Sequence, residues 1–258
     1  MKASRDTIAA IIMAAGQGKR MNDPTRAKVM YEINGRPMIH YVVDLAVALG
    51  AMRIVVIVGH QRQSVIQYLK KSHPTVICAV QDPQLGTGHA IMQSAEALKS
   101  FSGHVLVLSG DVPLLTEATM RKLLLHHSDT GAVATILTSN MSDPAGYGRI
   151  IRNPDGSVKR IVEHRDASAE ERKVKEINSG IYVFEKEKLF DGLKHITQNN
   201  SQNEYYLTDV FGYYWQHQWT VSALVADDER EIQGINTIEQ LDRVRGIMDS
   251  AFISPSKG

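Results

Sequence analysis

Short, almost uninterrupted apolar runs alternate with longer helical patterns through the first half of this 258-residue chain. Such runs are typical of strands that are covered on both faces. Strands are expected at residues 7–13, 53–58, 75–80, 104–108 and 132–138, and helices at 37–49, 61–71, 87–99 and 116–127. This order predicts an α/β fold with a doubly wound, mainly parallel (Rossmann-like) sheet.

The pattern changes after about Ser139, where shorter strands and turns replace the alternation. A turn at 153–156 separates candidate strands at 148–152 and 158–163 and predicts a β-hairpin. Further strands are expected at 177–184 and 220–225, a helix at 204–216, and a last helix that ends at Asp249. The pairs Ser168/Glu171 and Thr237/Gln240 are candidate capping boxes.

The charge balance and the cysteine content restrict the class of protein. The 29 basic and 28 acidic side chains give a formal charge of +1, so we expect neither nucleic acid nor a membrane as partner. The single cysteine, Cys78, excludes an internal disulfide framework and is expected to be a buried strand thiol. No run approaches the roughly 20 apolar residues of a membrane helix, so a soluble, cytoplasmic protein is expected.

A glycine-rich segment follows the first predicted strand. Gly16 and Gly18 allow a backbone to approach an anion closely, and Lys19, Arg20, Arg26 and Lys28 add four cations within ten residues. The carboxyl end of a strand in a doubly wound sheet suits a polyphosphate. A dinucleotide fingerprint needs a third glycine where Met21 stands, and the spacing does not fit a P-loop. A plain turn with solvated basic residues remains an alternative.

Two later loops also carry candidate ligand-binding residues. The glycines beside Thr87 would let a base or ribose lie against the backbone, and the Gln81 amide can both donate and accept hydrogen bonds. The same segment equally suits a helix start with Thr87 as its N-cap. Asp111 follows the run at 104–108, where α/β folds bind ligands, and its carboxylate suits Mg²⁺. Capping of the next turn is the alternative role for Asp111.

The order of these motifs resembles the sugar nucleotidyltransferases. The resemblance rests first on residues 14–21, 28–29, 81–90 and 110–115. Residues 146–150, 161–164, 176–181, 203–209 and 234–236 are similar to the bacterial N-acetylglucosamine-1-phosphate uridyltransferase (UDP-N-acetylglucosamine pyrophosphorylase) domain. The resemblance extends from about Ile8 to Asp249. Each motif alone is short, but the ordered series is specific.

The resemblance implies a division of the chain and a role for each matching residue. It implies one nucleotidyltransferase domain over residues 1–250, with a nucleotide-binding part at about 7–138, a β-rich sugar-binding part at about 139–226, a closing segment at 227–250 and a tail at 251–258. By the same resemblance, Arg20 and Lys28 neutralise phosphates, and the nucleotide binds to Ala14, Ala15, Gly16, Gly18, Gln81, Gly86 and Thr87. Gly148, Glu163 and Asn178 are implied to contact the sugar, and Asp111 and Asn236 to hold Mg²⁺.

The implied reaction converts UTP and N-acetylglucosamine 1-phosphate into UDP-N-acetylglucosamine and pyrophosphate. Alternatives are transfer to another sugar 1-phosphate or from another nucleotide, and a non-catalytic nucleotide-sugar sensor on the same fold. Two residues depart from the family pattern: Ala27 replaces a usual proline, and Ser109 stands where an aromatic residue is common. The chain lacks the hexapeptide period of the acetyltransferase domain that many relatives carry, so we expect no left-handed β-helix and no acetyltransferase activity. The oligomeric state is not predicted.

Overall fold

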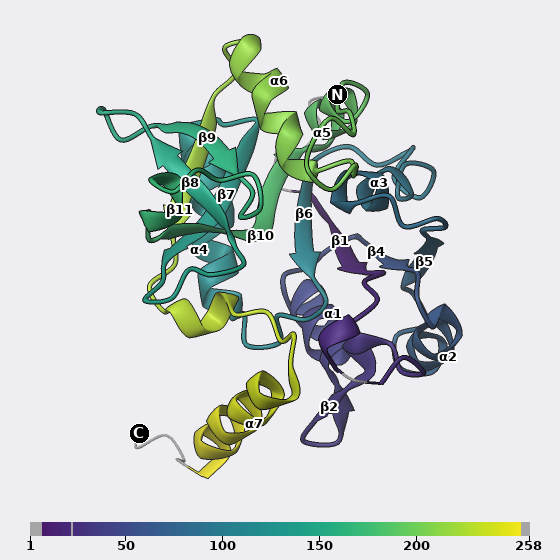
Figure 1. Cartoon of the computed structure of the whole chain (residues 1–258). Helices are drawn as coiled ribbons and strands as arrows, with labels where there is room; N and C mark the ends of the chain where they lie inside the picture. The colour runs from purple at the N-terminus through teal and green to yellow at the C-terminus, as the bar shows by residue number, and fades with distance from the viewer. Residues whose placement is uncertain (1–6, 22, 254–258) are drawn as a thin grey trace.

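A single mixed sheet forms the centre of the molecule (Figure 1). The computed structural model describes residues 7–21 and 23–253, without the side chains of Lys19 and residues 250–253. Within these residues nine strands share the sheet, with the main order β11-β7-β10-β6-β1-β4-β5; β8 pairs with β10, and β9 pairs with β8. The strands are β1 Ile8–Ala14, β4 Arg53–Val58, β5 Ile77–Val80, β6 His104–Ser109, β7 Ala134–Asn140, β8 Gly148–Arg152, β9 Val158–Val162, β10 Glu176–Glu185 and β11 Val221–Val225.

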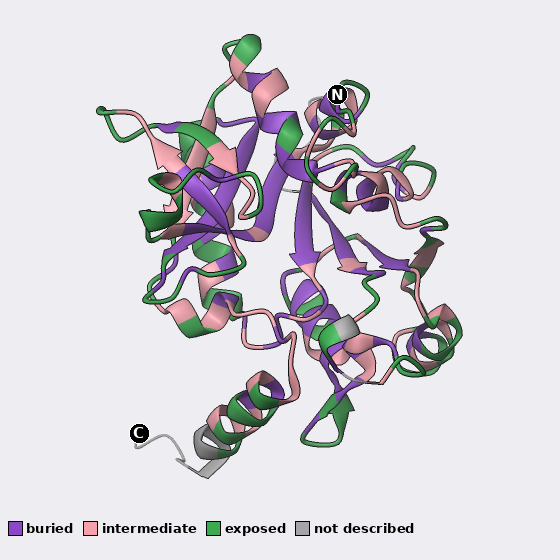
Figure 2. Cartoon of the chain, viewed as in Figure 1, coloured by how far each residue is buried: buried purple, intermediate pink, exposed green. Residues whose placement is uncertain are grey.

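Strand β1 lies at the centre of the parallel half and is buried on both faces (Figure 2). It pairs in parallel with β4 and β6, and β4 pairs in parallel with β5. On one face, Ile12 belongs to a core shared with α1 (Met38–Ala48), α2 (Arg62–Ser72) and α4 (Glu117–Thr130). On the other face, Ile11 packs with α3 (Thr87–Met92), α5 (Lys186–Gly192) and α6 (Val210–Gln216). The expected doubly wound α/β sheet is therefore confirmed.

Strand β10 joins the parallel half to the smaller β-rich part. Tyr182 and the residues after it pair antiparallel with β6, while Ile177 and Asn178 pair antiparallel with β8. The register with β7 shifts between Asn178 and Tyr182, where Gly180 has a φ of 79°. A β-bulge of this kind bends a strand and increases its twist. Strand β10 stays paired with β7 on both sides of the shift, while its first residues also pair with β8, to which β9 is added.

The last helix packs with residues from the beginning of the chain in a third, smaller hydrophobic core. Helix α7 (Ile238–Ile253) contributes Leu241 and Val244, which pack with Tyr31 and Met38 beside a hairpin of β2 (Glu32–Ile33) and β3 (Arg36–Pro37). The expected capping box is present, because Thr237 Oγ1 accepts from Gln240 N and Gln240 Oε1 accepts from Thr237 N. The box at Ser168 and Glu171 is present as well.

Several predicted boundaries are wrong for reasons that the structure makes visible. The helix expected at 87–99 ends at Met92 and continues as i→i+3 turns, in which Ser94 Oγ donates to Ile91 O. The helix expected at 204–216 begins with a 3₁₀ turn at Leu207. Residue 205 is instead held by backbone hydrogen bonds to residues 85 and 88. Helix α5 and the β2–β3 hairpin were not predicted.

Two expectations about burial and termini also need correction. Strand β5 lies at the edge of the sheet, and its residues are exposed or half-buried, so it is not covered on both faces; Cys78 is half-buried rather than buried. Helix α7 continues past Asp249 to Ile253, and the rest of the predicted tail, residues 254–258, lies outside the described residues. Across the part of the chain that the structure describes, no helix is long and apolar enough to cross a membrane.

Two histidines contact each other at the amino-terminal side of the sheet. His127 lies in the last turn of α4 and is only 1% exposed, whereas His104 is half-buried. Its Nδ1 bonds with Thr135 Oγ1 at 2.8 Å and its Nε2 with His104 Nδ1 at 3.1 Å. Burial, with His104 and His126 nearby, lowers the pKa of His127 to about 4. The imidazole is therefore neutral at pH 7 and does not act as a cation at the helix end.

We predict that His127 makes the protein less stable in mild acid. Its folded pKa lies below the ordinary value of 6.5, so the unfolded chain binds the proton more tightly. The stability is present above pH 6.5 and falls by about 3 kcal/mol as the pH drops towards 4. Urea unfolding of a His127→Gln variant should show a flatter pH profile than wild type over this range. The same change at the exposed His217 serves as control, and identical profiles for wild type and His127→Gln would contradict the prediction.

Candidate functional site

A cleft of about 400 Å³ lies at the carboxyl ends of the parallel strands. The segments after β1, β5 and β6 form its walls, and Glu204 comes from the segment before α6. Its lining residues are Met13, Ala14, Ala15, Gly16, Gln17, Lys28, Val29, Gln81, Gln84, Gly86, Thr87, Ala90, Ser109, Asp111 and Glu204. The parallel pairing of β1 with β4 and β6 brings these distant segments to one edge of the sheet.

The two glycines of the loop after β1 have different structural roles. Gly18 has a φ of 61°, and a Cβ there would lie 2.9 Å from Lys28 Cβ, so the fold itself requires glycine. Gly16 lies outside this left-handed region, and a Cβ there would meet nothing within 4 Å. Since Gly16 lines the cleft, its missing side chain leaves space that a ligand can occupy. The fold gives no reason for a glycine at this position.

Lys28 connects two residues that are far away in the sequence. Its Nζ forms an ion pair with Asp111 and donates to Asn236 Oδ1 at 3.1 Å, although these partners are 83 and 208 residues away. The lysine and aspartate side chains are only 16% and 15% exposed. The segment before α7 is held in place because Ile235 N donates to Asp111 O at 2.9 Å. Three predicted site residues therefore meet at the cleft.

The oxygens of Asp111 and Asn236 converge on a positive charge in a sterically open place. Both Asp111 Oδ2 and Asn236 Oδ1 bond to the Lys28 ammonium. A Cβ on Gly234 would lie 3.4 Å from Asp111 Oδ2 and 3.5 Å from Asn236 Nδ2, so glycine leaves these groups room. One carboxylate and one amide oxygen are hard donors of the type that Mg²⁺ binds together with waters and phosphates. The donor set therefore fits a magnesium ion.

The remaining cations of the loop are distributed differently. Arg20 is exposed in the 3₁₀ turn Lys19–Met21. Burial raises the pKa of the half-buried Tyr147, and the nearby charge of Arg20 acts against this rise. The Arg26 guanidinium lies over the Tyr31 ring, 5.1 Å from its centroid, and so is partly engaged. The side chain of Lys19 lies outside the description. Of the four cations, the structure brings only Lys28 into the lining of the cleft, as far as their side chains are described.

The loop after β5 forms the opposite wall. Gln81 is buried, and its Nε2 donates to Gly86 O at 2.9 Å, which braces the loop from inside. Gly86 has a φ of 106°, and a Cβ would lie 2.6 Å from Tyr205 O, so the close approach of two backbones requires glycine. Thr87 does not cap α3 with its side chain; its Oγ1 accepts from Leu207 N at 3.0 Å. The proposed N-cap role of Thr87 is therefore wrong.

The sequence reasoning assigned no role to several lining residues, among them Gln84 and Glu204. The Gln84 side chain donates to Ala15 O and so ties this loop to the glycine-rich loop. Its position between Gln81 and Gly86 was a usable signal. Glu204 reaches the cleft through the backbone pairing of residue 205 with residues 85 and 88, which no local pattern encodes. Ser109, which departs from the family pattern, lines the cleft as well.

The three predicted sugar-contacting residues form a second group on the β-rich part. Gly148 begins β8, Glu163 directly follows β9 and Asn178 lies on β10. A Cβ on Gly148 would lie 3.5 Å from both Asn178 Cβ and Glu163 Oε2, so the three residues are mutual neighbours. Asn178 Nδ2 donates to Tyr182 Oη at 2.7 Å, which fixes the amide. None of the three lines the cleft itself.

Glu163 is a partly buried carboxylate with one hydrogen-bond donor among the described side chains. Its Oε1 accepts from Thr208 Oγ1 at 3.0 Å. Burial raises the pKa of Glu163, and the acidic side chains of Asp209 and Asp166 raise it further. A buried acid without a cationic partner lowers stability, and groups perturbed in this way are concentrated at functional sites. The position of Gly180, where a Cβ would lie 3.6 Å from Ser109 Oγ, connects β10 to the cleft.

Comparison with known proteins places the chain among enzymes that act on nucleotides. A profile described as nucleotidyl transferase matches residues 9–231. The "Bifunctional protein GlmU" of Acetivibrio thermocellus is 44% identical over 248 residues, which are 96% of this chain and 53% of that protein. The protein of the same name from Exiguobacterium sibiricum is 47% identical over 227 residues, 88% of this chain and 50% of that protein. The chain spans about half the length of the relatives it matches.

A solved structure shows the same fold at low sequence identity. The crystal structure of a UDP-glucose pyrophosphorylase complexed with UDP-glucose superposes with a TM-score of 0.74 and is 16% identical. The match covers 95% of this chain and 99% of that chain. At this identity the likeness supports the shared architecture, a mixed sheet with mainly parallel strands in its first half and helices on both faces.

We predict that Glu163→Gln stabilises the protein at neutral pH. Because its folded pKa is raised, the ionised Glu163 opposes folding at pH 7, and the penalty disappears as the pH falls through the folded pKa. The variant should therefore unfold at a higher urea concentration than wild type at pH 7.5, with a smaller difference at pH 5. Glu239→Gln is the control, because hydrogen bonding lowers the pKa of that exposed acid. A lower unfolding midpoint for Glu163→Gln at pH 7.5 would contradict this account.

Proposed function

This chain belongs to the nucleotidyl transferase family, and we propose that it transfers the uridylyl group of UTP to N-acetylglucosamine 1-phosphate. The products would be UDP-N-acetylglucosamine and pyrophosphate. One observation carries the proposal: Lys28, Asp111 and Asn236 meet at the edge of a cleft that is lined by the glycine-rich loop. A bound triphosphate requires a cation, oxygen ligands for its metal ion, and a backbone that can approach its phosphates closely. The motif series over 146–236 supports the choice of sugar.

We assign UTP to the cleft at the ends of β1, β5 and β6. The backbone of Ala14, Ala15, Gly16 and Gly18 binds the phosphates, with Arg20 and Lys28 neutralising their charge. Gln81, Gly86 and Thr87 bind uracil and its ribose on the opposite wall. This assignment is supported by the lining of the cleft, which includes all of these except Gly18 and Arg20. The open space at Gly16 supports a phosphate there.

We assign the sugar to the group formed by Gly148, Glu163 and Asn178. A carboxylate accepts hydrogen bonds from sugar hydroxyls, and the partly buried Glu163 is only partly satisfied by Thr208. Gly148 leaves the space between Glu163 and Asn178 unfilled. The uncompensated charge of Glu163 would then find its partners in the substrate. This use explains why a destabilising carboxylate stands here.

Bound Mg²⁺ would supply charge neutralisation and orientation of the phosphates, with Asp111 and Asn236 as its protein ligands. Before the metal arrives, Lys28 satisfies both of these oxygens. With a metal on these oxygens, the Lys28 ammonium would be free to turn towards the phosphates. The chain's own contribution is thus a cation that is already held at the cleft by the oxygens that the metal will use.

The reaction needs positioning and charge compensation more than proton transfer. A phosphate oxygen of the sugar phosphate attacks the α-phosphorus of UTP; the new P–O bond forms as the bond to the β-phosphate breaks, and pyrophosphate leaves with the electron pair. The attacking oxygen is already anionic at neutral pH, so no general base is required. Lys28 and Arg20 offset the charge that develops during the transfer, and the backbone around Gly16 orients the phosphates. No residue forms a covalent intermediate.

We predict that Lys28→Ala lowers kcat by about 100- to 1000-fold, the range seen when one charge-stabilising group is lost. Its side chain contributes to no hydrophobic core, so circular dichroism should show an unchanged fold. The matched control is Lys122→Ala, which removes an exposed lysine of α4 that forms an ion pair with Asp227. Pyrophosphate release measures both. Wild-type turnover in a folded Lys28→Ala protein would exclude the assigned role.

We predict that Gly16→Ala weakens UTP binding without loss of stability. The added methyl group meets nothing in the empty cleft but occupies the space assigned to phosphate. The KM for UTP should rise at least tenfold, while the unfolding midpoint changes little. Gly212→Ala is the control, since a Cβ there also meets nothing within 4 Å but lies on α6. An unchanged KM in the Gly16 variant would remove the loop from the phosphate site.

A further inference from the structure

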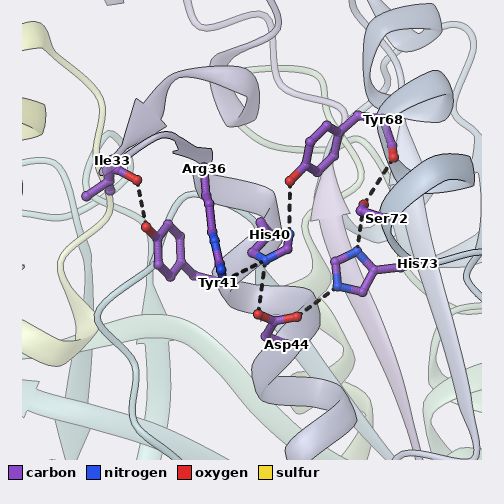
Figure 3. Close-up of polar contacts among 8 residues, drawn as sticks. All are labelled: Ile33, Arg36, His40, Tyr41, Asp44, Tyr68, Ser72 and His73. Carbon is purple, nitrogen blue, oxygen red and sulfur yellow. Dashed lines mark hydrogen bonds and ion pairs between the residues drawn. The ribbon is translucent and has the colours of Figure 1, made fainter.

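Two imidazoles and one carboxylate meet where α1 lies beside the end of α2, on the face of the parallel half that these helices cover (Figure 3). His40 and Asp44 lie one turn apart on α1, and His73 directly follows α2. His73 Nε2 lies 2.8 Å from Asp44 Oδ1, and His40 Nε2 lies 3.2 Å from Asp44 Oδ2. The ligand atoms all lie within 4.8 Å of one another, and among the described side chains no other such group occurs. None of the three residues lines the cleft.

The hydrogen bonds around His73 determine which ring nitrogen carries the proton. Ser72 Oγ donates its single proton to Tyr68 O at 3.0 Å, because a carbonyl can only accept. Ser72 Oγ therefore accepts from His73 Nδ1 at 2.8 Å, which makes Nδ1 the protonated nitrogen. In the neutral ring, Nε2 then directs a lone pair at the Asp44 carboxylate. Two acceptors at this distance repel each other unless a cation lies between them.

The contacts of His40 lead to the same tautomer. Arg36 Nη1 lies 3.2 Å from His40 Nε2, and since a guanidinium can only donate, Nε2 accepts. Nδ1 therefore carries the proton and donates to Tyr68 Oη at 2.9 Å. The unprotonated Nε2 of His40 thus lies 3.2 Å from Asp44 Oδ2, with Arg36 as its present donor.

We propose that His40, Asp44 and His73 bind a divalent transition-metal ion of the zinc class. Two imidazole nitrogens and a carboxylate, with one position left for water, form a donor set that zinc commonly takes. Each histidine already donates its other N–H to a hydroxyl, of Tyr68 or Ser72, as metal-bound histidines do. Tetrahedral bonds of about 2.1 Å bring ligand atoms to about 3.4 Å, so the widest pair closes by little more than 1 Å.

The surroundings allow entry and define the effect of binding. The two imidazoles are 15% and 10% exposed, whereas the Asp44 side chain is 49% exposed and opens the site to solvent. The metal would tie α1 to the end of α2, two helices that cover the same face of the sheet. Arg36 is the cation that faces the site; it is exposed and must turn away when the metal binds. Removing its charge should therefore strengthen metal binding.

Titration of the untagged, chelator-treated full chain with Zn²⁺ in saturating Mg²⁺ tests this site. Calorimetry should show one zinc ion at this site, and the melting temperature should rise with zinc concentration. His73→Gln should weaken zinc binding by more than 100-fold, because the loss of an outer partner alone costs about 10- to 100-fold. Tyr68→Phe should weaken it by about tenfold, and Arg36→Gln should tighten it. Circular dichroism confirms that each variant folds.

His126→Gln, which removes a histidine outside the group, should bind zinc like wild type. Equal zinc affinity for wild type and for the His40→Gln/His73→Gln double variant would overturn the proposal. A melting temperature that does not respond to zinc would do the same. Both readouts are independent of nucleotide turnover, so they test this site whether or not the proposed function holds.

Discussion

The parallel pairing of β1 between β4 and β6 is the constraint on which the site depends. It aligns the carboxyl ends of strands whose loops carry Gly16 and Asp111, and β5 adds the loop that holds Gln81 at the same edge. Helices bury both faces of β1, β4 and β6, so the register of these three strands cannot slip without exposing the core. The cleft therefore follows from the packing of the sheet, and its chemistry comes from the short loops beyond the strands.

Strand β10 makes the second half of the site possible. Its antiparallel pairing with β6 anchors it in the main sheet, and the shift before Tyr182 turns its other end towards β8. Gly180 permits that shift and also lies close to Ser109 of the cleft. Asn178 and the neighbouring Glu163 thereby lie on the β-rich part, which β10 joins to the strands that form the cleft. One bent strand thus links the two proposed substrate sites.

The fold class and the strand-end loops could be predicted from the sequence because each depends on a local pattern. Apolar runs predict buried strands, and a glycine such as Gly16 after a strand predicts close approach. The contact between Lys28 and Asn236 could not be predicted, since it joins residues that are 208 positions apart. The pairing of residue 205 with the loop at 85–88 likewise replaces a helical turn that the local sequence favours. Long-range contacts decide such segments, and spacing alone does not encode them.

In the proposed reaction, the cleft binds UTP, and the neighbouring residues Gly148, Glu163 and Asn178 bind the sugar 1-phosphate. Pyrophosphate release should be measured with the purified chain against UTP, CTP, ATP, GTP and dTTP, each with N-acetylglucosamine 1-phosphate or glucose 1-phosphate, with Mg²⁺ or with a chelator. The account predicts that UTP with N-acetylglucosamine 1-phosphate and Mg²⁺ is the most active combination and that activity is lost with chelator. No pyrophosphate release from any combination, with nucleotide binding retained, would contradict it.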